Sequence, residues 1–281
     1  MTVIFEFLKF LLYSGLIVII AKYLLVPVLR KLAESLNLKA KTVGNIAGIA
    51  TSVPELLTVS FSAFTGLLST SIYNIISSNV INLIQYILAV FLNKNQKVLQ
   101  NKALKIDLVM VVTTILIPAM LLLFKIEVGI TIVPIFLLLF FFFYYLNIQA
   151  HKLYLNKKTE QDMKIEEEAK WVKGKKKIMI RYAIYLLLIA IALYFIGDLL
   201  STTLENLCRQ FSIPEFIIGI LLGFITSIPE LITFFESQKH HKKQQNQEDG
   251  VIEAMNNLLT SNILNLFIIE SVGIVVFYTL S

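Results

Sequence analysis

The sequence predicts an all-α membrane protein with about eight transmembrane helices in two inverted-topology repeats, five spans in the first half and three in the second. Three observations predict this class: a very apolar composition, basic residues sorted into alternate loops, and an internal repeat. Hydrophobic residues make up 57% of the 281 positions and charged residues 16%. A soluble domain of this length needs a larger charged share to cover its surface.

Long apolar runs place the individual spans. Runs of about 20 residues match the thickness of the hydrocarbon core of a bilayer. The first run lacks the small-residue cleavage pattern of a signal peptide, so we expect it to remain as a span. The predicted helices cover residues 5–29, 43–61, 70–92, 106–124, 128–147, 178–200, 214–235 and 250–272.

The basic residues indicate the orientation of these spans. Nearly all of them lie in or beside the loops that follow spans one, three, five and seven, whereas the other loops hold only Lys125 and Arg209. Cytoplasmic loops of membrane proteins carry the excess of Lys and Arg. We therefore expect an integral multi-pass protein of the plasma (inner) membrane with both termini outside. The net charge of +6 reflects this sorting, and the expected surroundings are lipid rather than nucleic acid.

One long polar stretch divides the chain. Residues 151–177 are rich in Glu and Lys and predict a cytoplasmic linker, either a charged amphipathic helix or a flexible segment. The N-terminal half, 1–150, holds the first repeat at about 43–92. The C-terminal half, 178–281, holds the second repeat at about 214–272.

The repeat is visible as two aligned blocks. GNIAGIATSVPELLT, which begins at Gly44, aligns without a gap to GILLGFITSIPELIT, which begins at Gly219. NIISSNVINL, from Asn74, aligns to NLLTSNILNL, from Asn257. Four full spans separate span two from span seven, so the two copies are expected to enter the membrane in opposite directions. Inverted repeats with sites near the midplane are typical of transporters.

Glu55 and Glu230 occupy equivalent positions inside apolar spans. A charge at the centre of a bilayer costs about 2.5–3.5 kcal/mol on insertion scales. A cation between the two carboxylates would remove this cost, and two negative charges match one Ca²⁺, which prefers oxygen ligands. The pair therefore predicts a Ca²⁺ site.

Neighbouring residues offer further oxygens. Pro54 and Pro229 each prevent a helical hydrogen bond one turn back, which frees carbonyls near Thr51 and Thr226 for a metal ion. In addition, Asn and Ser recur every fourth residue in two matching stripes. These stripes either complete the cage or join helices by hydrogen bonds, and their symmetric pairing with the Pro-Glu motifs favours the cage. The stripe residues are Asn74, Ser78, Asn82, Asn257, Ser261 and Asn265.

The motifs TSVPEL with SSNVINL, and TSIPEL with TSNILNL, resemble the α-repeats of the cation/calcium exchanger superfamily, sodium/calcium exchanger type. The resemblance covers both repeats and implies a secondary active antiporter that exchanges Ca²⁺ for Na⁺ by alternating access. By position, Glu55 and Glu230 resemble the shared carboxylates, and Thr51 and Thr226 resemble carbonyl ligands. The resemblance further implies Na⁺-site oxygens at Ser52, Ser227, Ser78 and Ser261, and site residues at Asn82 and Asn265.

Two departures from the family pattern keep alternatives open. Asn265 stands where many sodium-coupled members have Asp, and proton-coupled relatives can have Asn there, so an H⁺-coupled Ca²⁺ exchanger is the first alternative. Members also commonly have five spans after the linker, where this sequence has three. We therefore expect either a homo-oligomer or a partner subunit in place of the last two helices, or a Ca²⁺-binding membrane subunit without transport.

An enzyme is not expected. The sequence has no Gly-x-x-x-x-Gly-Lys-[Ser/Thr] loop for a nucleotide, and neither His-Glu-x-x-His nor Gly-x-Ser-x-Gly occurs. No cofactor is expected either, because Ca²⁺ and Na⁺ or H⁺ are the transported ions. Glu253 and Glu270 fall toward the two ends of span eight, where we expect them at the interface, with Glu270 as a candidate vestibule carboxylate.

Overall fold

The computed structural model describes residues 3–35, 40–124, 128–166, 175–243 and 247–280. These residues form helices and no strand. Eight helical segments are long and apolar enough to cross a membrane, which confirms the predicted fold class and number of spans for the described part of the chain. The segments are Val3–Val28, Lys41–Phe64, Leu68–Leu92, Lys102–Leu123, Ile130–Ala150, Ile180–Gln210, Glu215–Lys242 and Gln247–Leu280.

Three of these spans are longer than the sequence predicted. The seventh runs to Lys242 instead of residue 235. The sixth runs to Gln210 instead of residue 200, because Leu200, Leu204 and Leu207 continue one fully buried face past the polar residues that suggested an end. The eighth runs to Leu280 instead of residue 272. The second repeat likewise extends further than predicted.

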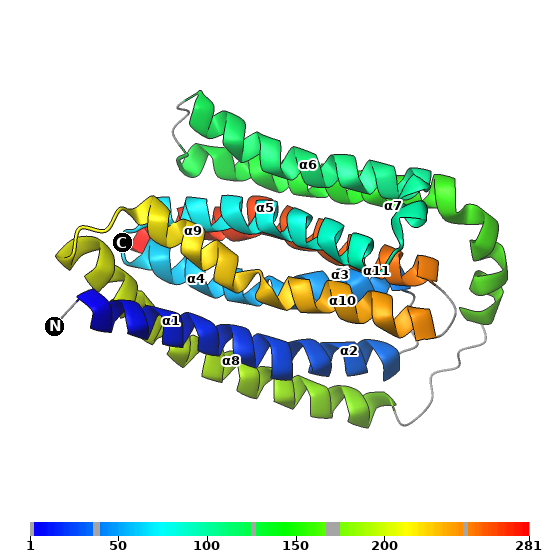
Figure 1. The fold of residues 1–281 in the computed structure, drawn as a ribbon, viewed down its shortest axis with the longest axis horizontal. Helices are drawn as coiled ribbons and strands as arrows, with labels where there is room; N and C mark the ends of the chain where they lie inside the picture. The colour runs from blue at the N-terminus through cyan, green and yellow to red at the C-terminus, as the bar shows by residue number, and fades with distance from the viewer. Residues whose placement is uncertain (1–2, 36–39, 125–127, 167–174, 244–246, 281) are drawn as a thin grey trace.

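The helices form three layers (Figure 1). The first layer pairs the N-terminal span with α8, and the third pairs α6 with α7; the repeats lie between them. The first layer contains α1 (Val3–Ile20), the π-helical turn η1 (Ala21–Leu25), α2 (Val26–Ser35), α8 (Lys175–Glu205) and the π-helical turn η4 (Asn206–Gln210). The third contains α6 (Lys102–Leu123) and α7 (Val133–Glu166), with the short turns η2 (Gln96–Gln100) and η3 (Ile130–Ile132) before them.

The central layer holds both repeats. The first repeat is α3 (Ala40–Thr51), α4 (Val53–Phe64) and α5 (Leu68–Leu92). The second is α9 (Glu215–Thr226), α10 (Ile228–Lys243), α11 (Gln247–Ile263), the π-helical turn η5 (Leu264–Ile269) and α12 (Glu270–Leu280). The most extensive packing crosses between the repeats, α5 against α9 and α3 against α11.

Four glycines show that these two crossings are built alike. A Cβ atom on Gly48 would lie 2.7 Å from the carbonyl oxygen of Asn257, and one on Gly223 would lie 2.6 Å from that of Asn74. Gly44 and Gly219 lie in the same way against the carbonyl oxygens of Glu253 and Thr70. Each glycine thus lets a helix backbone approach its neighbour closely, as small residues do in membrane proteins. The aligned positions of the sequence repeat therefore make equivalent contacts.

Two apolar clusters flank the central layer of helices. One joins α5, α6, α7, α10, α11 and η5 around Tyr86, Phe234 and Phe267. The other joins the first layer to α3 and α9 around Phe10, Leu200 and Leu222. The predicted linker begins as a continuation of α7, which runs to Glu166, and residues 167–174 of it lie outside the described residues.

Candidate cation site

Both repeats break at the serine that the Pro-Glu motifs contain. In the first, α3 ends at Thr51 and α4 begins at Val53, with Ser52 in a turn between them; in the second, Ser227 lies between α9 and α10. The backbone hydrogen bonds that bridge the first break run from Ser52 to Gly48 and from Leu56 to Ser52, so neither uses the carbonyl of Thr51. Proline two residues after the serine removes the donor that would continue the helix.

The second break repeats this pattern. Its bridging bonds run from Ser227 to Gly223 and from Leu231 to Ser227, and neither uses the carbonyl of Thr226. The carbonyls of Thr51 and Thr226 thus take no part in the bonds that bridge the breaks, and their role as metal ligands stays a prediction.

All ten predicted site residues lie inside the protein, each with at most 2% of its surface exposed. Three come from each helix break, two from α5 and two from the α11–η5 helix. The site residues are therefore shielded from solvent in this structure. The residues are Thr51, Ser52, Glu55, Ser78, Asn82, Thr226, Ser227, Glu230, Ser261 and Asn265.

The two carboxylates differ in their partners. Glu230 accepts a hydrogen bond of 3.1 Å from the hydroxyl of Ser261, and its second oxygen has no partner. Neither carboxylate oxygen of Glu55 has a hydrogen-bond partner. The two groups are close enough to interact electrostatically, and Thr226 of the opposite repeat lies beside Glu55. Two buried carboxyl groups that interact in this way would attract a cation when both are ionised.

The polar stripes connect the repeats across this centre. Asn82 points its amide nitrogen at Ser261 of the second repeat, at 3.5 Å, and Asn265 donates to Ser78 of the first, at 3.2 Å. Ser52 donates to Ser261 at 2.9 Å, which links the first break to the Glu230 carboxylate. The side-chain carbonyl oxygens of Asn82 and Asn265 have no donor. Asn82 and Asn265 therefore join helices through their amide nitrogens and leave their amide oxygens without a donor.

Two asparagines that the sequence analysis did not select cross at the centre of the bundle. Asn79 donates to the backbone carbonyl of Asn262 at 3.2 Å, and Asn262 donates to that of Asn79 at 3.1 Å. Both are fully buried. Their alignment in the SSN and TSN parts of the repeat was the signal that could have identified them.

Two threonines were also missed. Asn74 donates to Thr58 at 2.7 Å, and Asn257 donates to Thr233 at 2.5 Å. Thr58 and Thr233 in turn donate to the backbone carbonyls of Glu55 and Glu230. They hold the first turn of α4 and α10, so they position the carboxylates rather than face a cation directly.

The geometry fits a hard cation held by oxygen. Within the described residues, no group of three or more His, Cys, Asp or Glu side chains is placed to hold a metal ion. What this site has is two carboxylates and several neutral oxygens. Buried oxygens that accept no hydrogen bond favour a cation that binds without its hydration water. Flexible cages of oxygen ligands suit Ca²⁺.

Glu253 and Glu270 are both buried inside the protein, at 3% and 4% exposure. Glu253 accepts a hydrogen bond of 2.6 Å from Ser237 and contacts the ring nitrogen Nε2 of His241 at 2.9 Å. Neighbouring helices therefore cover both carboxyl groups, which their distance from the span ends could not indicate. Their position at the membrane interface stays a prediction.

A family model described as "Sodium/calcium exchanger protein" matches residues 7–150 and 181–280. The chain belongs to the sodium/calcium exchanger family. This exchanger is therefore a membrane transporter that exchanges cations, which agrees with the resemblance seen in its paired motifs.

Two solved structures share the fold of this exchanger. Both are of the sodium-calcium exchanger NCX_Mj, one soaked with 10 mM Na⁺ and zero Ca²⁺ and the other with 2.5 mM Na⁺ and 10 mM Sr²⁺. Identities are 19% and 18%, each with a TM-score of 0.52. The matches cover 98% of this chain and 84% and 83% of the other chains. No curated protein sequence matches the chain significantly.

Proposed function

We propose that this exchanger carries Ca²⁺ across the membrane in exchange for Na⁺, with both ions binding in turn between Glu55 and Glu230. The observation that supports this most is the set of buried oxygens without donors: both of Glu55, one of Glu230, and the amide oxygens of Asn82 and Asn265. The two carboxylates balance the charge of one Ca²⁺. The carbonyls of Thr51 and Thr226, the hydroxyls of Ser52, Ser227, Ser78 and Ser261, and these amide oxygens would complete its coordination.

The same charges favour exchange over one-way leakage. If Ca²⁺ leaves, two buried carboxylates remain in a protein interior where uncompensated charge is very costly. Na⁺ ions that enter the same cage would compensate them. A change of the empty site from one open side to the other is therefore disfavoured. Because the site must hold a cation when it changes sides, the Ca²⁺ flux is coupled to the Na⁺ flux.

Access would alternate through movement of the first layer. The N-terminal span packs against α8; the π-helical turn η1 lies within the N-terminal span, and η4 forms the end of the span that contains α8. Turns of this type are frequent at functional sites in helices. We propose that these two spans slide or rock together against the repeats and open the site toward one end at a time.

The distribution of basic residues supports a plasma (inner) membrane protein with outer termini. The start of α1 and the end of α12 lie at the same end of the bundle, as an even number of spans requires (Figure 1). The loops after spans one, three, five and seven would then face the cytoplasm.

The test is ⁴⁵Ca²⁺ uptake by the full chain in lipid vesicles under an imposed Na⁺ gradient. Glu55→Gln and Glu230→Gln should each lower uptake by about tenfold or more, because each removes one of the two site charges. A tenfold loss of affinity corresponds to only about 1.4 kcal/mol of binding free energy. Glu205→Gln is the matched control, because this glutamate lies at the exposed end of α8. If both site variants keep wild-type uptake, the site is wrong.

Two other functions are outcomes of the same assay. A pH gradient that drives uptake in the absence of a Na⁺ gradient would identify an H⁺-coupled exchanger, which the neutral Asn265 favours. Calcium binding without flux under either gradient would identify a Ca²⁺-binding membrane subunit.

A further inference from the structure

Glu270 is a buried carboxyl group outside the cation cage. Its exposure is 4%, and neither of its two oxygens has a hydrogen-bond partner. Glu253, on the same span and equally buried, shows the contrast, because Ser237 and His241 both contact its carboxylate. Burial of a charged group without hydrogen bonds or a counter-charge is among the most costly arrangements in a protein. Glu270 therefore requires an explanation that Glu253 does not.

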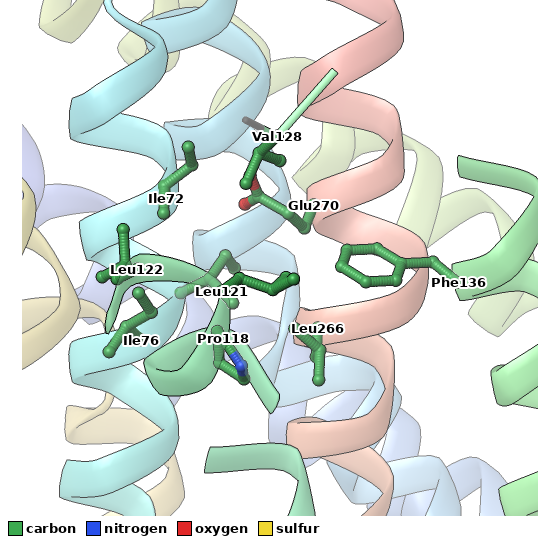
Figure 2. A pocket seen from close by; sticks show the side chains of 10 residues that line it. Ile72, Ile76, Pro118, Leu121, Leu122, Val128, Phe136, Leu266 and Glu270 are labelled. Carbon is green, nitrogen blue, oxygen red and sulfur yellow. The ribbon is translucent and has the colours of Figure 1, made fainter. Parts of the chain in front are cut away.

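The carboxyl of Glu270 points into an apolar cavity between the central layer and α6–α7. Figure 2 shows it directed from α12 toward Ile72 and Val128. Among the described residues that line the cavity, Glu270 is the one with an ionisable side chain. Its other lining residues are Ile72, Ile75, Ile76, Pro118, Leu121, Leu122, Val128, Phe136 and Leu266.

Among the described residues, the lining of the cavity holds no charged side chain besides Glu270. The lining residues of α5, α6, α7 and η5 are all apolar. On α4, which also packs against α12, Val59 lies in a small apolar cluster with Ile75 and Ile269. The nearest ionisable residue along α4 is Glu55, which belongs to the cation cage. None of the lining residues of the cavity is a member of that cage.

The chemistry of the cavity selects its occupant. A Ca²⁺ ion takes six to eight oxygen ligands, and a bound metal cation of any kind needs several. The cavity lining offers the two oxygens of one carboxyl group. A proton needs a single oxygen, and it converts the carboxylate into a neutral acid that an apolar cavity tolerates much better. The proton is therefore the cation that this cavity suits.

We propose that Glu270 is a proton-binding site, separate from the cage, which holds one proton while the cavity is closed and releases it when the cavity is hydrated. The reaction is the dissociation of a carboxylic acid into a carboxylate and a proton. Val128 precedes α7, so the cavity lies toward the end of the bundle that holds the α6–α7 connection. By the orientation proposed above, this end faces outside, and the proton would exchange with the outer solution.

A link to transport follows from the position of Glu270 in span eight. It comes directly after η5, the π-helical turn that also contains Asn265 of the cage. Hydration of the cavity would require α12 to move relative to α5 and α6. Opening of the outer end and loss of the proton would then accompany each other. This link rests on the proposed function, whereas the proton site itself does not.

The proton site can be tested without transport, by infrared spectroscopy of the purified full chain. The difference between wild type and Glu270→Gln should show the C=O band of a protonated carboxyl, and this band should disappear as the pH rises between about 4 and about 9, a range that includes buried carboxyls. The difference between wild type and Glu253→Gln should lack it, since Glu253 is held by its two partners. A Glu270 band that is absent, or that persists unchanged at every pH, would refute the site.

The link to transport needs a second measurement. Uptake of ⁴⁵Ca²⁺ into vesicles of one protein orientation is followed while the pH at the outer face alone is varied. Wild type should lose or gain rate over the range in which the Glu270 band titrates, and Glu270→Gln should remove that dependence. A variant with an unchanged pH profile refutes the link. Because the infrared band needs no flux, failure of the proposed transport and failure of the proton site are distinguishable.

Discussion

Substitution of Gly223 by alanine tests how closely the two repeats must pack. A Cβ atom at this position would lie 2.6 Å from the carbonyl oxygen of Asn74 and 2.8 Å from the amide nitrogen of Ser78, and it would overlap the hydroxyl of Ser77. The Ser77 side chain can turn away, but the two backbone atoms of α5 cannot. Helices α9 and α5 must therefore move apart.

The cost can be estimated from two opposing effects. Overpacking of a tight interface typically costs about 1–3 kcal/mol. Alanine in place of glycine returns about 1 kcal/mol through its higher helix propensity. The expected result is a net loss of up to about 2 kcal/mol in the free energy of unfolding. Calcium binding should also weaken, because Thr226 lies one helical turn from Gly223.

The measurement is thermal unfolding of the full chain in detergent, with and without Ca²⁺. Gly15→Ala is the matched control, since a Cβ atom on Gly15 of α1 would meet nothing within 4 Å. That variant should be as stable as wild type or more so. If Gly223→Ala and Gly15→Ala unfold at the same temperature, close contact between α9 and α5 is not what holds the repeats together.

Four further substitutions give separate expectations. Asn79→Ala and Asn262→Ala should each destabilise the protein by about 1–3 kcal/mol, since each leaves a buried carbonyl without its donor, and thermal unfolding would show it. Ser261→Ala should weaken Ca²⁺ binding measured by calorimetry, since this hydroxyl holds the Glu230 carboxylate at 3.1 Å. Glu270→Leu should raise the free energy of unfolding by about 1–3 kcal/mol, because it removes an unpartnered polar group from an apolar cavity.

Each of these has an outcome that would contradict it. Wild-type stability in either asparagine variant would mean that the hydrogen bonds between Asn79 and Asn262 do not stabilise the protein. Calcium affinity unchanged in Ser261→Ala would mean that the serine hydroxyl does not position Glu230. A lower stability for Glu270→Leu would mean that the glutamate has a stabilising partner in the folded protein.

The location of the candidate site could be predicted because it follows from local chemistry. Proline two residues after Ser52 and Ser227 interrupts a helix whatever surrounds it, and the structure has both breaks at those serines. The apolar runs likewise predicted eight spans, since hydrocarbon thickness fixes how many residues a helix needs. The glycines of the two repeats indicated close contact between helices, but the sequence could not show which helix backbone each glycine would contact.

The partners of equivalent residues could not be predicted. Glu55 and Glu230 occupy identical motifs, yet Ser261 donates to Glu230, whereas its counterpart Ser78 donates to the carbonyl of Ile75 in its own helix. A hydroxyl can turn toward either acceptor at little cost, so the packing around it decides the choice. The sequence repeat therefore limits the possible hydrogen-bond partners of each residue but does not determine which hydrogen bonds form.

The sequence by itself determined the class of the protein, its spans, the two helix breaks and the residue types of the cage, because each depends on neighbours along the chain. The tertiary structure alone decided that Asn79 crosses Asn262 and that Glu253 has donors. It also decided that Glu270 faces an apolar cavity. These features depend on which helices lie against which, and burial removes the water that would otherwise satisfy each polar group.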